Sequence, residues 1–152
     1  MRNEIIDDRD RKILKLLVNN SRLSIRQLAK RLKLSPGTVQ LRLKRLKDLG
    51  LIKGYTTLID YSKLGYEFPV LIDVRVSRGR LFEVEREIAK HPNVVAVYDV
   101  TGNYDIAIIA RFKRRKDLDN FVKNLQKIEY VERTNTRLIL NIIVENKWGE
   151  LI

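Results

Sequence analysis

The sequence predicts an α+β protein with two units, a basic helical front and a rear built around a β-sheet. In residues 8–49, apolar side chains recur at the three- and four-residue spacing of amphipathic helices, whereas after residue 67 several segments alternate as strands do. The charge divides at the same place, because residues 1–60 hold 15 Lys and Arg against 6 Asp and Glu, and residues 61–152 hold 16 against 13. We therefore expect a front domain over 1–60, a linker over 61–66 and a rear domain over 67–152.

The composition limits the classes of protein that this chain can be. A formal net charge of +12, concentrated in the front half, favours a polyanion as partner. There is no cysteine, which excludes disulfides and thiolate metal sites, and the single histidine, His91, cannot form a metal site without carboxylates. No apolar run reaches the roughly 18 residues of a membrane span, and no signal peptide precedes the first helix. We expect a soluble, cytoplasmic protein with no metal, no cofactor and no membrane partner.

The front half contains three predicted helices. The first is capped by Asp7 or Asp8 and extends to about residue 19. The second starts after Ser24, which is a good N-cap, and the third after Ser35, with a proline suited to its first position. Gly50 ends the third helix. Two helices joined by so short a turn form a helix-turn-helix, whose second helix enters the major groove of DNA.

The third predicted helix has a basic face opposite its apolar stripe of Val39, Leu43 and Leu46. Arginine pairs with guanine and glutamine with adenine, whereas lysines more often contact phosphates. A solvated charged face on an ordinary helix pair is the alternative. Because a single unit buries little surface, we expect a two-fold dimer with recognition helices about 34 Å apart. The predicted DNA-binding residues are Ser35, Gly37, Thr38, Gln40, Leu41, Arg42, Lys44, Arg45 and Lys47.

The rear half alternates between strand and helix patterns. Residues 51–60 are β-branched and predict one or two short strands, which would form a wing or the exit from the front domain. Strands are then predicted at 70–76, 94–100, 106–112 and 131–144, and helices at 80–90 and 116–128. This βαββαβ order is typical of the ferredoxin-like fold. Residues 138–144 are apolar on both faces, so we expect a second copy of the chain to cover the free face of the sheet.

Three further segments have a possible function. The loop Thr101–Asp105 is either a plain hairpin connection or a small-ligand site, in which backbone N–H groups at Gly102 hold a carboxylate. Asp105 would then accept an ammonium group, with hydroxyls from Thr134 and Thr136. The basic run 111–116 is a solvated loop or a supplementary DNA contact, and Trp148 is expected to anchor the C-terminus. No catalytic constellation is found, so we do not expect an enzyme.

The sequence resembles the Lrp/AsnC transcription regulators, also called feast/famine regulatory proteins. The matching residues cover nearly the whole chain in order. They are Asp8, Asp10, Ile13 and Leu14 in the first helix, Leu34-Ser35-x-x-Thr38-Val39-x-x-Arg42-Leu43-x-x-Leu46, Gly50-Leu51-Ile52-x-x-Tyr55, Leu64-Gly65, Thr101-Gly102-x-Tyr104-Asp105 and Thr134-x-Thr136. Pro36-Gly37 departs from the small polar residues or alanine usual in the family, which leaves the base preference open.

The resemblance implies a helix-turn-helix or winged-helix domain joined to a ferredoxin-like regulatory domain. It also implies dimers through the sheet, assembled into octamers of four dimers, and an amino acid effector bound between dimers. The effector residues carried over are Thr101, Gly102, Asn103, Tyr104, Asp105, Thr134 and Thr136. A transcription regulator that binds double-stranded DNA is thus expected. The alternatives are an architectural, nucleoid-type DNA-binding protein without an effector, and an amino-acid-sensing regulatory subunit of an enzyme.

Overall fold

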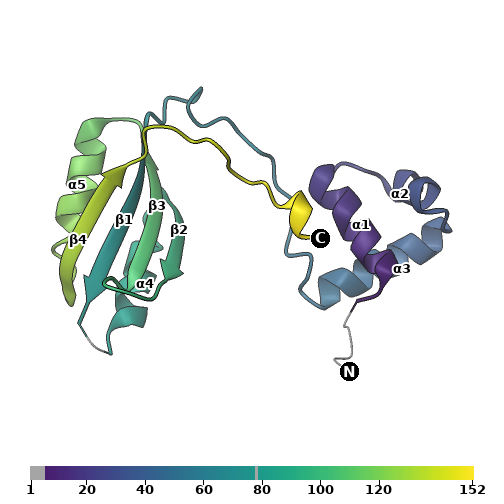
Figure 1. Cartoon of the computed structure of the whole chain (residues 1–152), viewed down its shortest axis with the longest axis horizontal. Coiled ribbons are helices and arrows are strands. Elements are labelled where there is room, and N and C mark those ends of the chain that lie inside the picture. The colour runs from purple at the N-terminus through teal and green to yellow at the C-terminus, as the bar shows by residue number, and fades with distance from the viewer. Residues whose placement is uncertain (1–5, 78) are drawn as a thin grey trace. The chain divides into compact units, whose positions relative to one another are not determined.

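The computed structural model describes residues 6–77 and 79–152 (Figure 1). They form two compact units. One contains the described residues up to Leu58 together with Val144–Ile152, and the other contains Ile59–Ile143. The C-terminal segment therefore belongs to the helical unit, although the sequence pattern assigns it to the rear domain. No helix in the described part of the chain is long and apolar enough to cross a membrane.

The helical unit contains the three helices that the sequence predicts, α1 (Asp8–Asn19), α2 (Ile25–Leu32) and α3 (Pro36–Asp48). Each begins at a side-chain cap. Asp7 Oδ1 accepts the N–H of Asp10 at 2.9 Å, and Ser35 Oγ accepts the N–H of Thr38 at 3.1 Å. Ser24 caps α2 in the same way. Because these caps satisfy N–H groups that a helix leaves unpaired, local sequence fixes where each helix starts.

The three helices bury one apolar cluster between them. Its buried members come from the predicted stripes, and Ile6, Leu14, Leu43 and Ile52 pack against it. The C-terminal 3₁₀ turn η1 (Gly149–Leu151) contacts α1 from the same unit. The buried members are Ile13, Leu17, Leu28, Ala29, Val39 and Leu46.

The strands predicted over 51–60 do not form. Residues 52–60 have neither helical nor strand structure, and Tyr55 and Leu58 are exposed there. The prediction from the β-branched pattern is wrong here, because a strand needs a hydrogen-bonded neighbour and this segment has none within the described chain. Over its described residues, the helical unit therefore has no pair of strands that could form a wing.

The second unit is a four-stranded antiparallel sheet covered by two helices. Its strands β1 (Phe68–Val76), β2 (Val94–Asp99), β3 (Ile106–Phe112) and β4 (Val131–Leu138) lie in the order β2-β3-β1-β4. The helices α4 (Leu81–Ile88) and α5 (Arg115–Leu125) pack on one face, as Figure 1 shows. The βαββαβ order is thus confirmed. The buried core lies between helices and sheet, with Val70, Ile72, Val74, Ile106, Ile108 and Phe112 from the sheet and Val84, Ile88, Phe121 and Leu125 from the helices.

The last strand is shorter than the sequence predicts. It ends at Leu138, and the backbone N–H of Ile139 makes one further bond to the carbonyl of Pro69 at 2.9 Å. Its partner β1 begins at Phe68, so residues beyond 139 have no neighbour to pair with. The apolar run that continues toward the C-terminus is left exposed, with Leu140 and Ile143 more than four-fifths accessible.

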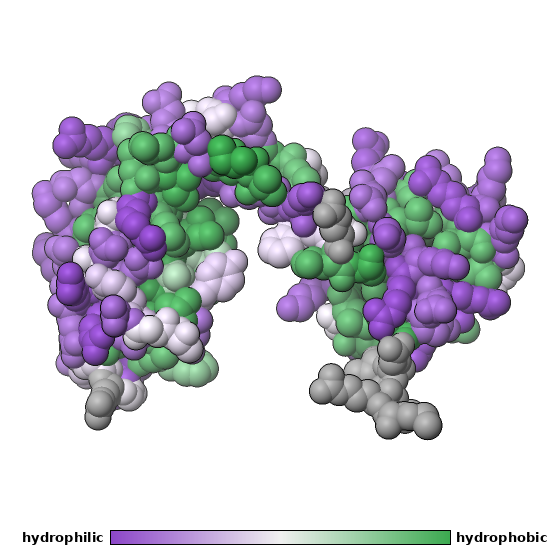
Figure 2. Space-filling model, viewed as in Figure 1, coloured by the Kyte–Doolittle hydropathy of each residue, from purple (hydrophilic) through white to green (hydrophobic). Residues whose placement is uncertain are grey.

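The face of the sheet opposite the helices is uncovered. By register it carries Leu71 of β1 beside Ile109 of β3, with Tyr98 of β2 opposite Ala107. Figure 2 shows hydrophobic residues gathered on the visible face of this unit and along the segment that leads to the C-terminus. On β4 this face becomes polar, because Arg137 pairs with Asp73 at 2.8 Å.

Candidate DNA-binding face and ligand loop

Helix α3 presents two different flanks. Val39 and Leu46 are fully buried against α1 and α2. At 100° per residue, Gly37, Leu41 and Lys44 lie on the side opposite these residues, with Gln40 and Lys47 beside them. These five, together with Ile25 and Leu43, line a shallow hollow of about 580 Å³. The structure therefore gathers five of the nine predicted DNA-binding residues on one surface, which we call the outer face of α3.

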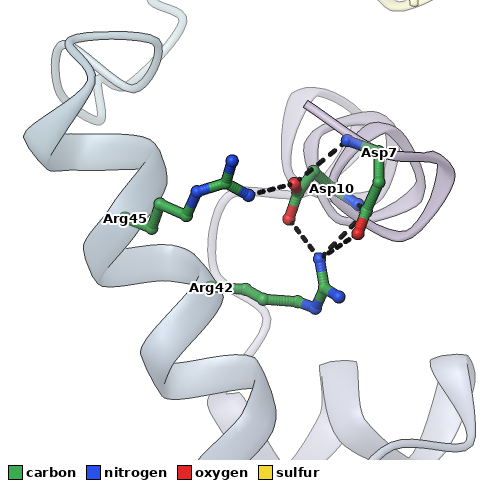
Figure 3. Close-up of polar contacts among 4 residues, drawn as sticks. All are labelled: Asp7, Asp10, Arg42 and Arg45. Atoms are coloured by element: carbon green, nitrogen blue, oxygen red, sulfur yellow. Dashed lines mark hydrogen bonds and ion pairs between the residues drawn. The ribbon is translucent and has the colours of Figure 1, made fainter. Parts of the chain in front are cut away.

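Arg42 and Arg45 lie on the flank that faces α1 (Figure 3). Arg42 Nη1 donates to Asp10 Oδ1 at 2.8 Å and to both carboxylate oxygens of Asp7, at 2.8 and 2.9 Å. Arg45 Nη1 donates to Asp10 Oδ2 at 3.1 Å. The Asp10 side chain is fully inaccessible, whereas that of Arg42 is 20% exposed and that of Arg45 is 53% exposed.

In this cluster each charge is stabilised by an opposite one. The hydrogen bonds from Arg42 to Asp10, and then to Asp7, raise the pKa of Arg42 above its ordinary value. The pKa of Asp7 is lowered, first by the N–H of Asp10 and then by the guanidinium of Arg42. A buried carboxylate needs such partners, because without them its charge would be desolvated and uncompensated. The cluster therefore ties α3 to α1, a role that the basic-face pattern did not reveal.

Asp7 and Asp10 are functional neighbours that the sequence reasoning missed as a pair. In the sequence, Asp7 is recognisable only as a helix cap, and Asp10 only as one of the residues that carry the family resemblance. The available indication was three acids, Asp7, Asp8 and Asp10, at the start of a domain otherwise rich in lysine and arginine. Which arginines they would meet depends on how α1 and α3 cross, and no local pattern contains that information.

Ser35 and Thr38, the last two of the nine predicted DNA-binding residues, and the two lysines of the outer face have local partners. Ser35 Oγ and Thr38 Oγ1 lie 2.8 Å apart at the start of α3. Lys44 pairs with Asp48 at 2.9 Å, which raises the pKa of Lys44. Lys47 Nζ lies 5.4 Å from the ring centroid of Tyr55. Exposed pairs of this kind are weak, so they leave the lysines able to contact phosphates.

The loop Thr101–Asp105 joins β2 to β3 and lies beside the end of β1. Asp105 Oδ2 accepts the N–H of Val76 at 2.8 Å, and the N–H of Asp105 donates to the carbonyl of Val74 at 2.9 Å. Gly102 has a φ of +116°, which a residue with a Cβ rarely adopts. One carboxylate oxygen of Asp105, Oδ2, thus already holds the loop against β1.

The two parts of the predicted ligand site lie on different faces of the sheet. Arg75, on the uncovered face, donates to the carbonyl of Asn103 at 2.8 Å. The ring of Tyr104 lies under the guanidinium of Arg133, 5.8 Å from it. Thr134 and Thr136, in contrast, stand opposite the buried Val74 and Ile72 and so share the helix face, where Gln126 Nε2 donates to Thr134 Oγ1 at 3.1 Å. Within one protomer the structure does not bring the loop and the threonines together.

The other segments singled out from the sequence are mostly structural. In the basic run 111–116, Arg111 is buried and Arg114 forms an ion pair with Asp117 at 2.8 Å. Trp148 precedes η1 and lines the groove beside α1 within the helical unit. Among the described residues, no group of three or more Asp, Glu or His side chains could hold a metal ion.

Comparison with known proteins identifies both units. Residues 6–53 match the family model described as winged helix-turn-helix DNA-binding, and residues 69–149 match the Lrp/AsnC ligand binding domain. The chain belongs to the Lrp/AsnC family. It is a transcriptional regulator with a helix-turn-helix DNA-binding domain and an Lrp/AsnC ligand-binding domain.

Curated relatives are similar over nearly their whole length. An uncharacterized HTH-type transcriptional regulator of Pyrococcus furiosus is 47% identical over 141 residues, which cover 93% of this chain and 95% of that one. The HTH-type transcriptional regulator FL11 of the same organism is 35% identical and covers 91% of each chain. That these Lrp/AsnC relatives are named as regulators agrees with a protein that is not an enzyme.

Solved structures of Lrp/AsnC proteins share the fold. Escherichia coli AsnC is 27% identical with a TM-score of 0.85, over 92% of this chain and 95% of that one. A transcriptional regulator of Neisseria meningitidis, solved as an L-Met complex, is 25% identical with a TM-score of 0.85, over 97% and 99% of the two chains. The predicted α+β class, with its front helix-turn-helix and rear ferredoxin-like domain, is confirmed.

Proposed function

We propose that this regulator binds specific sites in double-stranded DNA through the outer face of α3, as a dimer or larger assembly, and responds to an amino acid. The observation that carries the proposal is the outer face itself. Gln40, Lys44 and Lys47 project from it around an exposed leucine, while the opposite stripe is buried. A rigid helix with cationic and amide groups on its free side fits the major groove.

The dimer is proposed from the uncovered face of the sheet. Leu71 and Ile109 lie on it side by side, and Leu140 and Ile143 are exposed in the segment that follows β4. An apolar surface of this kind is typical of an interface between subunits, and a self-complementary patch produces two-fold pairs. Such pairing would present two copies of α3, as a two-fold DNA site requires. Assembly of four dimers into an octamer is an extension of the same proposal.

The amino acid is proposed for the Thr101–Asp105 loop. The ligand-binding family of the rear domain and the L-Met complex of the Neisseria protein support an amino acid as the class of ligand. Asp105 offers a carboxylate for an ammonium group, and Gly102 leaves the backbone approachable. Because Thr134 and Thr136 lie on the other face, we propose that the loop and the threonines of different copies complete each site. A ligand that binds only the assembled form stabilises it by RT ln(1 + [L]/Kd).

DNA binding is tested by a matched pair of lysine substitutions. Lys44→Ala should weaken binding and reduce the slope of log K against log salt by about 1, because one phosphate contact is lost. Lys123→Ala is the control, since Lys123 is also exposed and paired with an aspartate four residues away, on α5. Equal effects of the two substitutions would contradict a role for the outer face.

Two further measurements separate the proposed function from its alternatives. Footprinting should show discrete protected sites, whereas uniform coverage would indicate an architectural protein. Calorimetry with each of the twenty amino acids should give heat with at least one of them, together with a change in particle mass. No heat with any of them would remove the effector, and an absence of DNA binding would favour an amino-acid-sensing subunit of an enzyme. A cytoplasmic location follows from the proposal, since the site of action is DNA.

A further inference from the structure

We propose that Leu41 recognises the 5-methyl group of thymine in the major groove, which makes an A·T pair the central recognised base pair of each half-site. This inference rests on the proposed DNA-binding function and names the base that the outer face of α3 reads. It is carried by the exposure of Leu41, by the residues around it and by the orientation of the neighbouring arginines.

Leu41 is the exposed apolar residue at the centre of the outer face. The residue is 69% exposed, and it takes no part in the cluster that α1, α2 and α3 bury. Gly37 lies one turn before it, and a Cβ built on Gly37 would meet nothing within 4 Å. The surface next to Leu41 is therefore open, so that a flat ligand can approach the leucine closely.

The surroundings of Leu41 indicate what kind of ligand covers it. A single exposed leucine is ordinary on a protein surface and means little by itself. Here, however, Gln40, Lys44 and Lys47 line the same hollow, and the domain that carries them has a net charge of +9 over residues 1–60. Charge complementarity favours a polyanion. Within the major groove, the thymine methyl is the apolar group that a leucine can contact.

The arginines of α3 do not compete for the same position. Guanine is most often read by arginine, through a bidentate contact to its O6 and N7 atoms. Arg42 and Arg45 instead turn toward α1, where both donate to the buried Asp10. The residue adjacent to Leu41 on the outer face is Gln40, whose amide suits the N6 and N7 atoms of adenine. Adenine and the thymine methyl are offered by the same A·T pair or by neighbouring ones.

The test removes one methyl group from the DNA and one side chain from the protein. A site selected with the wild-type protein is prepared with each thymine replaced in turn by deoxyuridine, which differs only in lacking that methyl. We expect a loss of affinity of about three- to tenfold at one position per half-site, as burial of a single methyl group implies. With Leu41→Ala, the same replacement should change affinity by less than about 1.5-fold.

Leu64→Ala is the matched control, because Leu64 is exposed but lies outside α3. It should retain both the wild-type affinity and the full penalty for deoxyuridine. Wild-type affinity for every deoxyuridine site would overturn the inference about Leu41 and leave the DNA-binding function standing. An equal penalty for wild type and Leu41→Ala would assign the methyl to another residue and overturn it too. Failure to select any site would overturn the proposed function itself, and this inference with it.

Discussion

Replacing Arg42 by alanine should destabilise the helical unit because it takes the principal partner from a buried carboxylate. Asp10 Oδ1 accepts from Arg42 at 2.8 Å, and the side chain of Asp10 is inaccessible to solvent. In Arg42→Ala, Asp10 keeps only the weaker bond from Arg45, at 3.1 Å, and the N–H of Asp7, at 3.2 Å.

The magnitude follows from these contacts. A hydrogen bond to a charged group contributes about 1.5–3 kcal/mol, and breaking a buried ion pair costs about 3–5 kcal/mol. Because Asp10 retains two donors and Arg42 is itself 20% exposed, we expect a loss of about 2–3 kcal/mol. Arg45→Ala is the matched control. Its longer bond and 53% exposure predict a loss of at most about 1 kcal/mol.

Native-state hydrogen exchange on the full chain measures this difference domain by domain. For Arg42→Ala, peptides from α1 and α3 should exchange roughly 30- to 150-fold faster, since each 1.4 kcal/mol is a factor of ten. Peptides from β1 and β3 should be unchanged, because they belong to the other unit. An acceleration below about threefold, or one equal to that of Arg45→Ala, would refute the reasoning. A loss of DNA binding by Arg42→Ala would then have to be read as loss of a base contact.

Three other changes test the rear unit. Ile109→Lys places a charge on the uncovered face of the sheet and should reduce the particle mass in light scattering to that of a monomer. The control Phe82→Lys, on the exposed side of α4, should leave the particle mass unchanged. An unchanged mass for both variants would exclude this face as the interface. Gly102→Ala forces a side chain into a φ of +116° and should lower the free energy of unfolding by about 1–3 kcal/mol in denaturant titrations; an unchanged midpoint would show that the loop can relax. Burial lowers the pKa of His91, so protonating this residue costs more in the folded than in the unfolded chain. The free energy of unfolding should therefore be highest above about pH 6.5 and should decrease as the pH falls from there toward the lowered pKa. His91→Asn should flatten this dependence in thermal unfolding, and an unaltered slope would assign it to other groups.

Helix positions could be predicted from the sequence because their determinants are local. Ser24 and Ser35 cap helices whose apolar stripes lie within a few residues, and the structure starts both helices there. The βαββαβ order was accessible for a similar reason, since each buried strand alternates or runs apolar over its own length. Nothing beyond neighbouring residues is needed for either inference.

Strand extent could not be predicted in the same way. The segments 51–60 and 139–144 are rich in β-branched and apolar residues, yet neither forms a strand, and beyond the bond from Ile139 to Pro69 the second segment has no strand partner among the described residues. A strand is stabilised by hydrogen bonds to another segment, so its limits depend on where that other segment begins and ends. Local composition reports a preference for extended backbone, but it does not say whether a partner segment is in reach.

The DNA-binding face shows the same limit at the level of single residues. Charge and helical spacing place Arg42 and Lys44 together in one basic set, but the two lie about 160° apart around α3 and face different surroundings. α1 contributes the buried Asp10, which takes Arg42 out of the exposed set and leaves Leu41 and Gln40 as the base-reading candidates. If the outer face of α3 reads DNA as proposed, its specificity is set partly by Asp10, a buried residue of α1. It follows that a change at Asp10 could release both arginines and alter the preferred base without any substitution on the outer face.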